Sequence, residues 1–389
     1  MVKFLVIFLL VLISPINPLL AEDSSQTQKK QSLKYNFRAR FGYFALNRDK
    51  RDGETIKRDN FRLRIQTGLD YHITPKLKVT GRISGRFANA QDQFKFLLND
   101  YIPLGQTSIN LGEATVDKLY VRYVLTPSLT MRAGRMQQTY KLASVPGKSL
   151  DRENSSSTNI NWTDGVHLTW RFHENWNLHF TAQHNSAKGS SNVARQPLDF
   201  SSSNSRISYY TLVEKIKQLG GWHQLNFSFN YFPDALPLYG EPNEDLLDYY
   251  TLAGRASIRL LPLPLFNADL VVGGEAGYAF NTPSKVATKT SHDSTDMAGN
   301  TAMFLSANLM NMFEKHNIGV VIGWIEDGWL LSPNLVNNKF EREVRHQYYI
   351  KDKLSMETRI RFRDDLNKLV DYERKLSQMD LFIRLSYSL

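Results

Sequence analysis

The chain is 389 residues long and basic, with 48 Lys and Arg against 38 Asp and Glu, a formal net charge of +10 and no cysteine. The absence of cysteine excludes disulfide bonds, thiolate metal sites and cysteine nucleophiles, so the fold depends on backbone pairing and burial. The excess of positive charge suggests anionic partners or solutes, and we expect no nucleic-acid partner.

The first 21 residues have the pattern of a secretory signal peptide. Lys3 is followed by an apolar run from Phe4 to Ile13, and Ala21 precedes acidic residues. The alternative, an N-terminal membrane anchor, is disfavoured because the run is too short for a membrane helix. We expect export with cleavage after Ala21, a short polar periplasmic segment over residues 22–32, and the folded domain over residues 33–389.

Long segments of this domain alternate between apolar and polar side chains. The stretch FRLRIQTGLDYHI (61–73) does so over 13 residues. A soluble strand is usually five or six residues long, whereas a tilted membrane strand needs about nine to eleven. The same alternation recurs in YNFRARFGYF (35–44), QLNFSFNYF (224–232), LSMETRIRFR (354–363) and QMDLFIRLSYSL (378–389). One stretch, RISYYTLVEKIKQL (206–219), fits a helix as well as a strand.

Short turns and long polar connections follow each other along the chain. YHITPKLKV (71–79) and YVLTPSLTM (123–131) each place Thr-Pro between two strands, where proline favours a tight turn, and FHENWNL (172–178) is a third turn. Long connections cover residues 47–58, 89–112, 141–161, 185–205, 233–244 and 281–298. This rhythm predicts an all-β fold, a closed antiparallel transmembrane β-barrel of about 16 strands with short periplasmic turns and long extracellular loops.

Two motifs and the C-terminus carry a family resemblance. The segments TMRAGRMQQTY (130–140) and NWTDGVHLTWRF (161–172) resemble the Gly-Arg and Trp-x-Asp-Gly strands of outer-membrane porins, a group that includes phosphate-selective and alginate-export porins. The final MDLFIRLSYSL is similar to the insertion signal of Gram-negative outer-membrane proteins, with Leu389 where Phe is usual.

The resemblance implies a cell outer membrane location, contact with lipid and lipopolysaccharide, passive passage of small hydrophilic solutes, and the homotrimer common in the group. We do not infer phosphate or alginate as a solute of this protein from the resemblance. Strand parity sends Arg135 to the lipid side, whereas the Gly-Arg resemblance favours an inward position.

Arginines gather on the predicted inward positions of the first five and the last three strands, which closure makes neighbours. The predicted pore-lining residues are Arg38, Arg40, Arg62, Arg64, Arg82, Arg86, Arg122, Arg132, Arg345, Arg359, Arg361, Arg363 and Arg384. Such a basic half-lumen favours anions. Pairing with Asp70, Glu357 or Asp380 would weaken that preference.

Two long connections are candidates for a constriction inside the lumen. The connection 141–161 contains Lys148, Asp151, Arg152 and Glu153, and the connection 89–112 contains the apolar run FKFLL (94–98). A run that apolar is unusual for an exposed loop. The alternative is a loop that lies over the rim.

The sequence predicts no enzyme. It contains no nucleophile elbow, His-Glu-x-x-His helix, phosphate-binding loop or dinucleotide fingerprint, and no His and carboxylate spacing typical of metal sites, so we expect no catalytic residue, metal or cofactor. A passive diffusion channel is therefore the favoured function. The alternatives are a non-conducting surface barrel, adhesin-like or structural, whose loops bind a partner, and a soluble exported β-protein.

Overall fold

The structure is a computed structural model. It describes residues 32–88, 113–152, 160–186, 195–201, 203–216, 221–238, 245–332 and 334–389, together with the backbone of residues 95–96. The predicted signal peptide, almost all of the segment 22–32 and most of the connection 89–112 lie outside the described residues.

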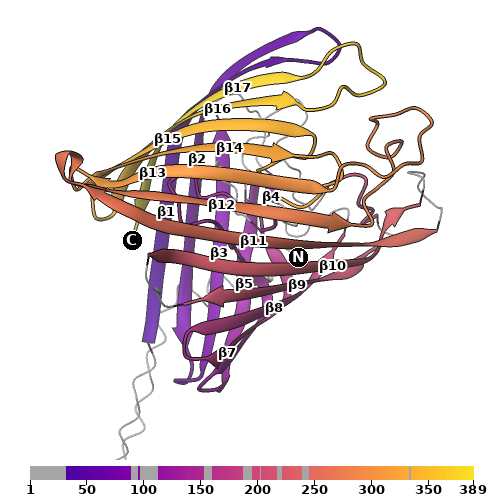
Figure 1. Ribbon diagram of the computed structural model, residues 1–389. Helices are drawn as coiled ribbons and strands as arrows, with labels where there is room; N and C mark the ends of the chain where they lie inside the picture. Colours follow the sequence, from indigo (N-terminus) through magenta and orange to yellow (C-terminus); the bar gives the residue numbers. More distant parts are fainter. Residues whose placement is uncertain are drawn as a thin grey trace, which may run out of the picture. The chain divides into compact units, whose positions relative to one another are not determined.

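The described chain forms one sheet (Figure 1). Its strands are β1 (Ser32–Asp49), β2 (Thr55–His72), β3 (Leu77–Ala88), β4 (Lys95–Phe96), β5 (Glu113–Thr126), β6 (Leu129–Met136), β7 (Thr163–His173), β8 (Trp176–Asn185), β9 (Arg206–Lys215), β10 (Trp222–Pro237), β11 (Leu246–Leu263), β12 (Ala268–Phe280), β13 (Thr301–Met312), β14 (His316–Ile325), β15 (Lys339–Lys351), β16 (Leu354–Asp365) and β17 (Ser377–Ser388). A short 3-10 helix, η1 (Pro264–Phe266), connects β11 to β12.

The sheet closes on itself. The last strand, β17, pairs antiparallel with β1 from Arg38↔Ser388 to Asp49↔Ser377, and every other consecutive pair in the wall is also antiparallel. The two-residue β4 pairs parallel with the start of β5, so it is an addition to the wall and not part of it. Sixteen strands therefore make the closed barrel, as the sequence predicted.

The turns confirm the predicted rhythm. Residues 73–76 connect β2 to β3, with the Leu77 backbone N–H donating to the Thr74 carbonyl at 3.2 Å, and Pro127 and Ser128 connect β5 to β6. The ambiguous stretch 206–219 begins with strand β9 and is not helical over Arg206–Lys215. We call the rim with these connections the short-turn rim and the opposite one the long-loop rim; β1 begins and β17 ends at the short-turn rim.

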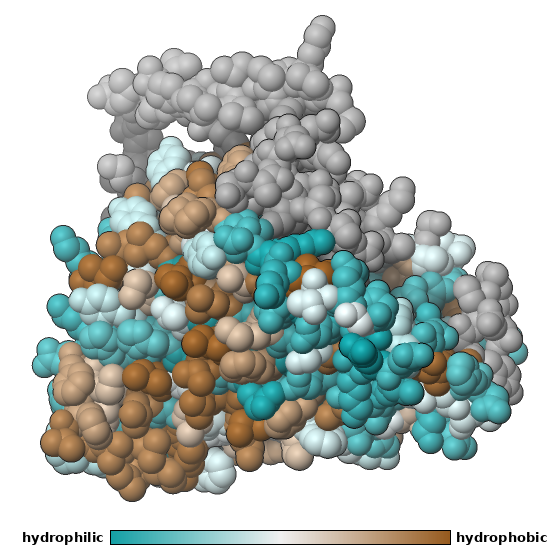
Figure 2. All heavy atoms as spheres, turned by 90° about the horizontal axis from the view of Figure 1, so that it is seen from above, coloured by the Kyte–Doolittle hydropathy of each residue, from teal (hydrophilic) through white to brown (hydrophobic). Residues whose placement is uncertain are grey.

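The two faces of the wall have opposite chemistry. Large apolar side chains point outward and are exposed, for example Tyr35 at 72% and Leu305 at 71%, and Figure 2 shows broad apolar areas on the surface in view. Inward positions carry buried Arg, Glu, Asn, Ser and Thr. This arrangement is inverted relative to a soluble protein, and an outer surface of this kind matches hydrocarbon.

Among the described residues, no helix is long and apolar enough to cross a membrane.

An apolar core lies inside the ring and not outside it. We call it the apolar inner cluster. The strands β9 to β14 contribute Tyr210, Phe232, Tyr249, Phe304 and Val321 to it, among others, and inward-folded connections contribute the rest. The connection residues are Leu142, Leu150, Leu198, Phe200, Trp329, Leu330, Leu331 and Leu335.

Candidate functional site

One connection crosses the lumen. We call residues 137–152, which follow β6, the Lys148 segment. Its backbone is fastened to the opposite wall, because the Val145 N–H donates to Asn308 Oδ1 at 2.9 Å and the Leu150 N–H donates to Glu275 Oε2 at 3.1 Å. Backbone donors of an irregular segment need such partners when they leave water.

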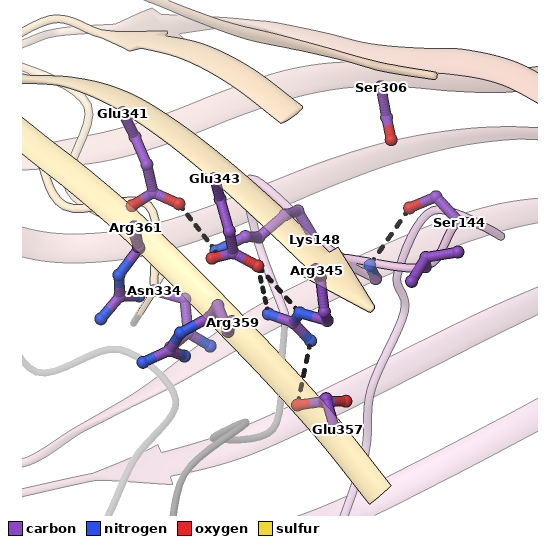
Figure 3. A network of polar contacts seen from close by, with 12 residues as sticks. Ser144, Lys148, Ser306, Asn334, Glu341, Glu343, Arg345, Glu357, Arg359 and Arg361 are labelled. Carbon is purple, nitrogen blue, oxygen red and sulfur yellow. Dashed lines mark hydrogen bonds and ion pairs between the residues drawn. The ribbon is translucent and has the colours of Figure 1, made fainter. Parts of the chain in front are cut away.

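Lys148 ties the same segment to β15. Its ammonium lies 2.7 Å from Glu341 and 2.8 Å from Glu343, and only 1% of its side chain is exposed (Figure 3). The two carboxylates have further partners: Arg363 lies 2.6 Å from Glu341 and Arg345 contacts Glu343. Charges this deeply buried are tolerated only when they are paired in this way.

Asp151 makes the second charged attachment of the segment. Arg255 on β11 lies 3.0 Å from Asp151 and 2.7 Å from Glu275 on β12. Burial alone would raise the pKa of Asp151, but the Arg255 guanidinium and the Ser149 hydroxyl outweigh it and hold the pKa below its usual range.

Arg152 lies beside Asp151 and points to another part of the wall. It donates to Thr163 and Gln183 at 2.6 and 2.7 Å, and its guanidinium lies 3.9 Å from the centre of the Tyr210 ring. Of the four candidate residues on this connection, Lys148, Asp151 and Arg152 are therefore buried inside the barrel, while Glu153 lies outside the described residues.

Several of the sequence-predicted arginines are paired with carboxylates. Arg359 and Arg361 both reach Asp380, at 2.5 and 2.8 Å, so one carboxylate on β17 serves two cations of β16. Arg82 lies 2.5 Å from Asp117, Arg384 lies 3.0 Å from Glu357, and Arg345 lies 3.8 Å from Glu357. Of the three acids named as competing partners, Glu357 and Asp380 pair with arginine, whereas Asp70 pairs with Lys78 at 3.3 Å.

The remaining predicted arginines lie on β1, β2, β3, β5 and β6. In the strand register, Arg40 on β1 is paired with Arg64 on β2, and Arg64 is paired with Arg86 on β3. Arg62 packs against Phe44, with 3.9 Å between the guanidinium carbon and the ring centre. Arg122 and Arg132 face each other across β5 and β6, and Arg38 lies opposite Gln66.

A cavity of about 640 Å³ opens beneath the Lys148 segment, toward the short-turn rim. Six cationic side chains line it against a single carboxylate, Glu357. The cations are Arg38, Arg40, Arg345, Arg384, Lys141 and Arg259. The first four come from the predicted basic wall, while Lys141 and Arg259 come from the segment and the far side of the barrel. Neutral donors, among them Gln347, Asn311 and Asn317, complete the lining.

The inward position expected for Arg135 is wrong. The register places Arg135 opposite Leu119 and Asp164, on the outward side of β6. It is neutralised there, because Asp164 lies 2.8 Å away and the guanidinium sits 4.2 Å from the centre of the Trp162 ring. A neutral, hydrogen-bonded pair lowers the cost of a charge on this face.

The same contact explains the two motifs singled out in the sequence. Gly134 pairs with Gly165, and Arg135 meets both Trp162 and Asp164, so the Gly-Arg and Trp-x-Asp-Gly strands are one interlocking unit. Gly134 has φ 120°, a conformation that favours glycine.

Sequence reasoning missed two features of the interior. Asp117 and Lys118 follow each other, but a register shift between Arg82 and Ile83 turns Asp117 inward, where it is fully buried. The second is the segment after β14, whose Trp329 and Leu330 enter the lumen. The apolar run GWLL in this connection could have predicted its inward position, since an apolar run in a connection is the feature that singled out residues 94–98.

Among the described residues, no group of three or more His, Asp or Glu side chains is arranged to hold a metal ion.

Comparison with known proteins agrees with this architecture. The structure is similar to OprB of Pseudomonas putida, with a TM-score of 0.60 and 10% identity over 91% of this chain and 94% of that one. The fold is that of outer-membrane porins. The outer membrane channel DcaP of Acinetobacter baumannii matches with a TM-score of 0.56 and 12% identity over 95% of this chain and 100% of that one. OccK8 (OprE) of Pseudomonas aeruginosa matches at 0.55 and 12% over 91% and 98%. No protein-family model and no curated protein sequence matches the chain.

Proposed function

We propose that the protein is an outer-membrane channel for passive diffusion of small hydrophilic solutes, and that it prefers anions. The proposal rests on the cavity beneath the Lys148 segment, where six cations face one carboxylate. Fixed charges along a confined passage concentrate ions of the opposite sign, most strongly at low salt. Arg359 and Arg361 of β16 do not line this cavity, and Asp380 neutralises one of their two charges.

Reversal potentials in planar bilayers test the preference. With a KCl gradient across the membrane, we expect a potential of the sign given by chloride selectivity, and a smaller one at high salt. The variant R38Q/R40Q removes two of the six cavity cations and should move the potential toward zero. R342Q is the matched control, because Arg342 lies at an exposed position and pairs with Asp364 away from the cavity. A clear cation preference of the unmodified protein would refute the proposal.

One observation favours a second candidate, a non-conducting surface barrel that binds a partner through its loops. The apolar inner cluster occupies part of the lumen, which a wide passive channel does not need. The same bilayer recording separates the two functions, since a folded protein that gives no conductance steps fits only the second.

Location and processing belong to the proposal as well. We expect the protein in the outer-membrane fraction, in contact with lipid and lipopolysaccharide, with a mature N-terminus at Glu22 after loss of residues 1–21. The resemblance to phosphate-selective and alginate-export porins supports membership in that group and a homotrimer. N-terminal sequencing and the native mass in detergent test the N-terminus and the trimer.

A further inference from the structure

We infer that the connection after β14 is a second inward-folded segment that fills part of the lumen, holds the Lys148 segment in place and thereby sets the width of the passage. This Trp329 segment comprises residues 326–338, of which the structure describes all but residue 333. The statement about width rests on the proposed function, because a passage exists only if the barrel conducts. The attachment between the two segments does not depend on it.

The burial of the segment is the first observation. Trp329, Leu330, Leu331 and Leu335 are all fully buried, although they belong to a connection at the long-loop rim. Connections normally lie on the surface. Burying each leucine contributes about 1.5–3 kcal/mol, so the inward position is strongly favoured over a solvated loop.

The wall is shaped to receive Trp329. Gly277 lies on β12 two residues beyond the inward Glu275, and a Cβ built on Gly277 would stand 2.5 Å from the Trp329 ring. No side chain larger than hydrogen fits there with the ring in place. The indole therefore packs directly on the backbone of the barrel wall.

Hydrogen bonds connect the two segments. The Leu150 carbonyl, two residues after Lys148, accepts from the Trp329 indole N–H at 2.9 Å and from the Ser332 backbone N–H at 2.9 Å. The Trp329 segment is itself fixed by Tyr249, whose hydroxyl donates to the Gly328 carbonyl and accepts from the Leu330 N–H, each at 3.0 Å.

A second connection runs through Glu341. Lys148 and Arg363 both pair with this carboxylate, and Arg363 also donates to the Asn334 carbonyl. Figure 3 shows the contact between Lys148 and this carboxylate. The two segments are thus joined at Leu150 and again at Glu341, so release of one loosens the other.

Thiol labelling tests the attachment, because the chain has no cysteine and Leu150→Cys provides the sole thiol. The thiol should react slowly with a water-soluble maleimide in the otherwise unmodified protein, since Leu150 is fully buried. Trp329→Ala should raise the labelling rate, as it removes the ring and one of the two donors to the Leu150 carbonyl. Gly277→Val should do the same by displacing the ring. Gly81→Ala is the control, because a Cβ at Gly81 meets nothing within 4 Å.

Single-channel recording tests the width. Trp329→Ala should raise the unitary conductance and add brief current transitions, whereas Gly81→Ala should match the unmodified protein. Heat-modifiable migration in gels checks that each barrel is folded. Unchanged labelling and unchanged conductance in a folded Trp329→Ala barrel would overturn the inference. Absence of current from the unmodified protein would instead remove the proposed function, and labelling would still decide the attachment.

Discussion

Replacement of Lys148 by methionine tests whether its ion pairs hold the segment that crosses the lumen. Methionine keeps an unbranched side chain that is one atom shorter than lysine, and it removes the charge. Lys148 is 1% exposed and both glutamate side chains are fully buried, so the bulk solvent screens this pair little. Removing one partner of a buried pair costs about 3–5 kcal/mol. Each carboxylate keeps one arginine, Arg363 or Arg345, so we expect a value near the lower end, about 3 kcal/mol.

A loss of that size shifts the equilibrium between the docked and the released segment by roughly a hundredfold. Two assays report it: the unfolding midpoint of the purified barrel in detergent, and current noise in planar bilayers. We expect K148M to unfold earlier and to show frequent transitions between conductance levels. Lys285 provides the control, since K285M removes an exposed pair with Asp296 at 3.4 Å, worth at most about 1 kcal/mol. Equal behaviour of K148M and K285M would refute the reasoning.

Two further predictions concern charges at other places in the barrel. R135M leaves the Asp164 carboxylate without its cation on the outward face and should cost about 2 kcal/mol, while R135M/D164L should recover most of the loss; unfolding midpoints of the three proteins decide this. For Asp151, the pKa is held below its usual range, so its contribution to stability is complete above the ordinary aspartate value of about 3.9 and is lost as the pH falls through the lower folded pKa. Unfolding midpoints measured from pH 6 to pH 2 should therefore fall more steeply in the acid range for the unmodified protein than for D151N, and parallel curves would contradict the assignment.

The barrel was predictable because alternation with period two survives in sequence. In the stretch 61–73 each apolar residue faces outward, and a one-residue slip would reverse every side chain, so the pattern fixes the faces. The two Thr-Pro turns fixed which strands are neighbours. The same parity is the basis on which inward positions were predicted for the thirteen arginines.

The period-two alternation could not predict which arginines are neutralised by carboxylates. Arg361 lies directly across from Asp380, and Arg359 reaches the same carboxylate from two residues away, a result that depends on the stagger between β16 and β17. The inward turn of Asp117 depends on one extra residue in β5 relative to β3, which leaves no mark in the sequence. For Arg135, parity gave the correct outward side, and the inward expectation came from the Gly-Arg resemblance. That expectation did not foresee Asp164, 29 residues away, which neutralises the charge on the outward face.

The apolar inner cluster divides the barrel wall into two arcs with different interiors, one apolar and one charged. On the arc from β9 to β14, a substitution in the apolar inner cluster disturbs packed side chains and should change the stability of the fold. On the arc from β15 through β1 to β3, it meets charge and changes what the interior attracts. The charge of the interior can therefore be altered on the second arc without touching the apolar inner cluster, provided that Glu341 and Glu343, which hold the Lys148 segment, are left in place.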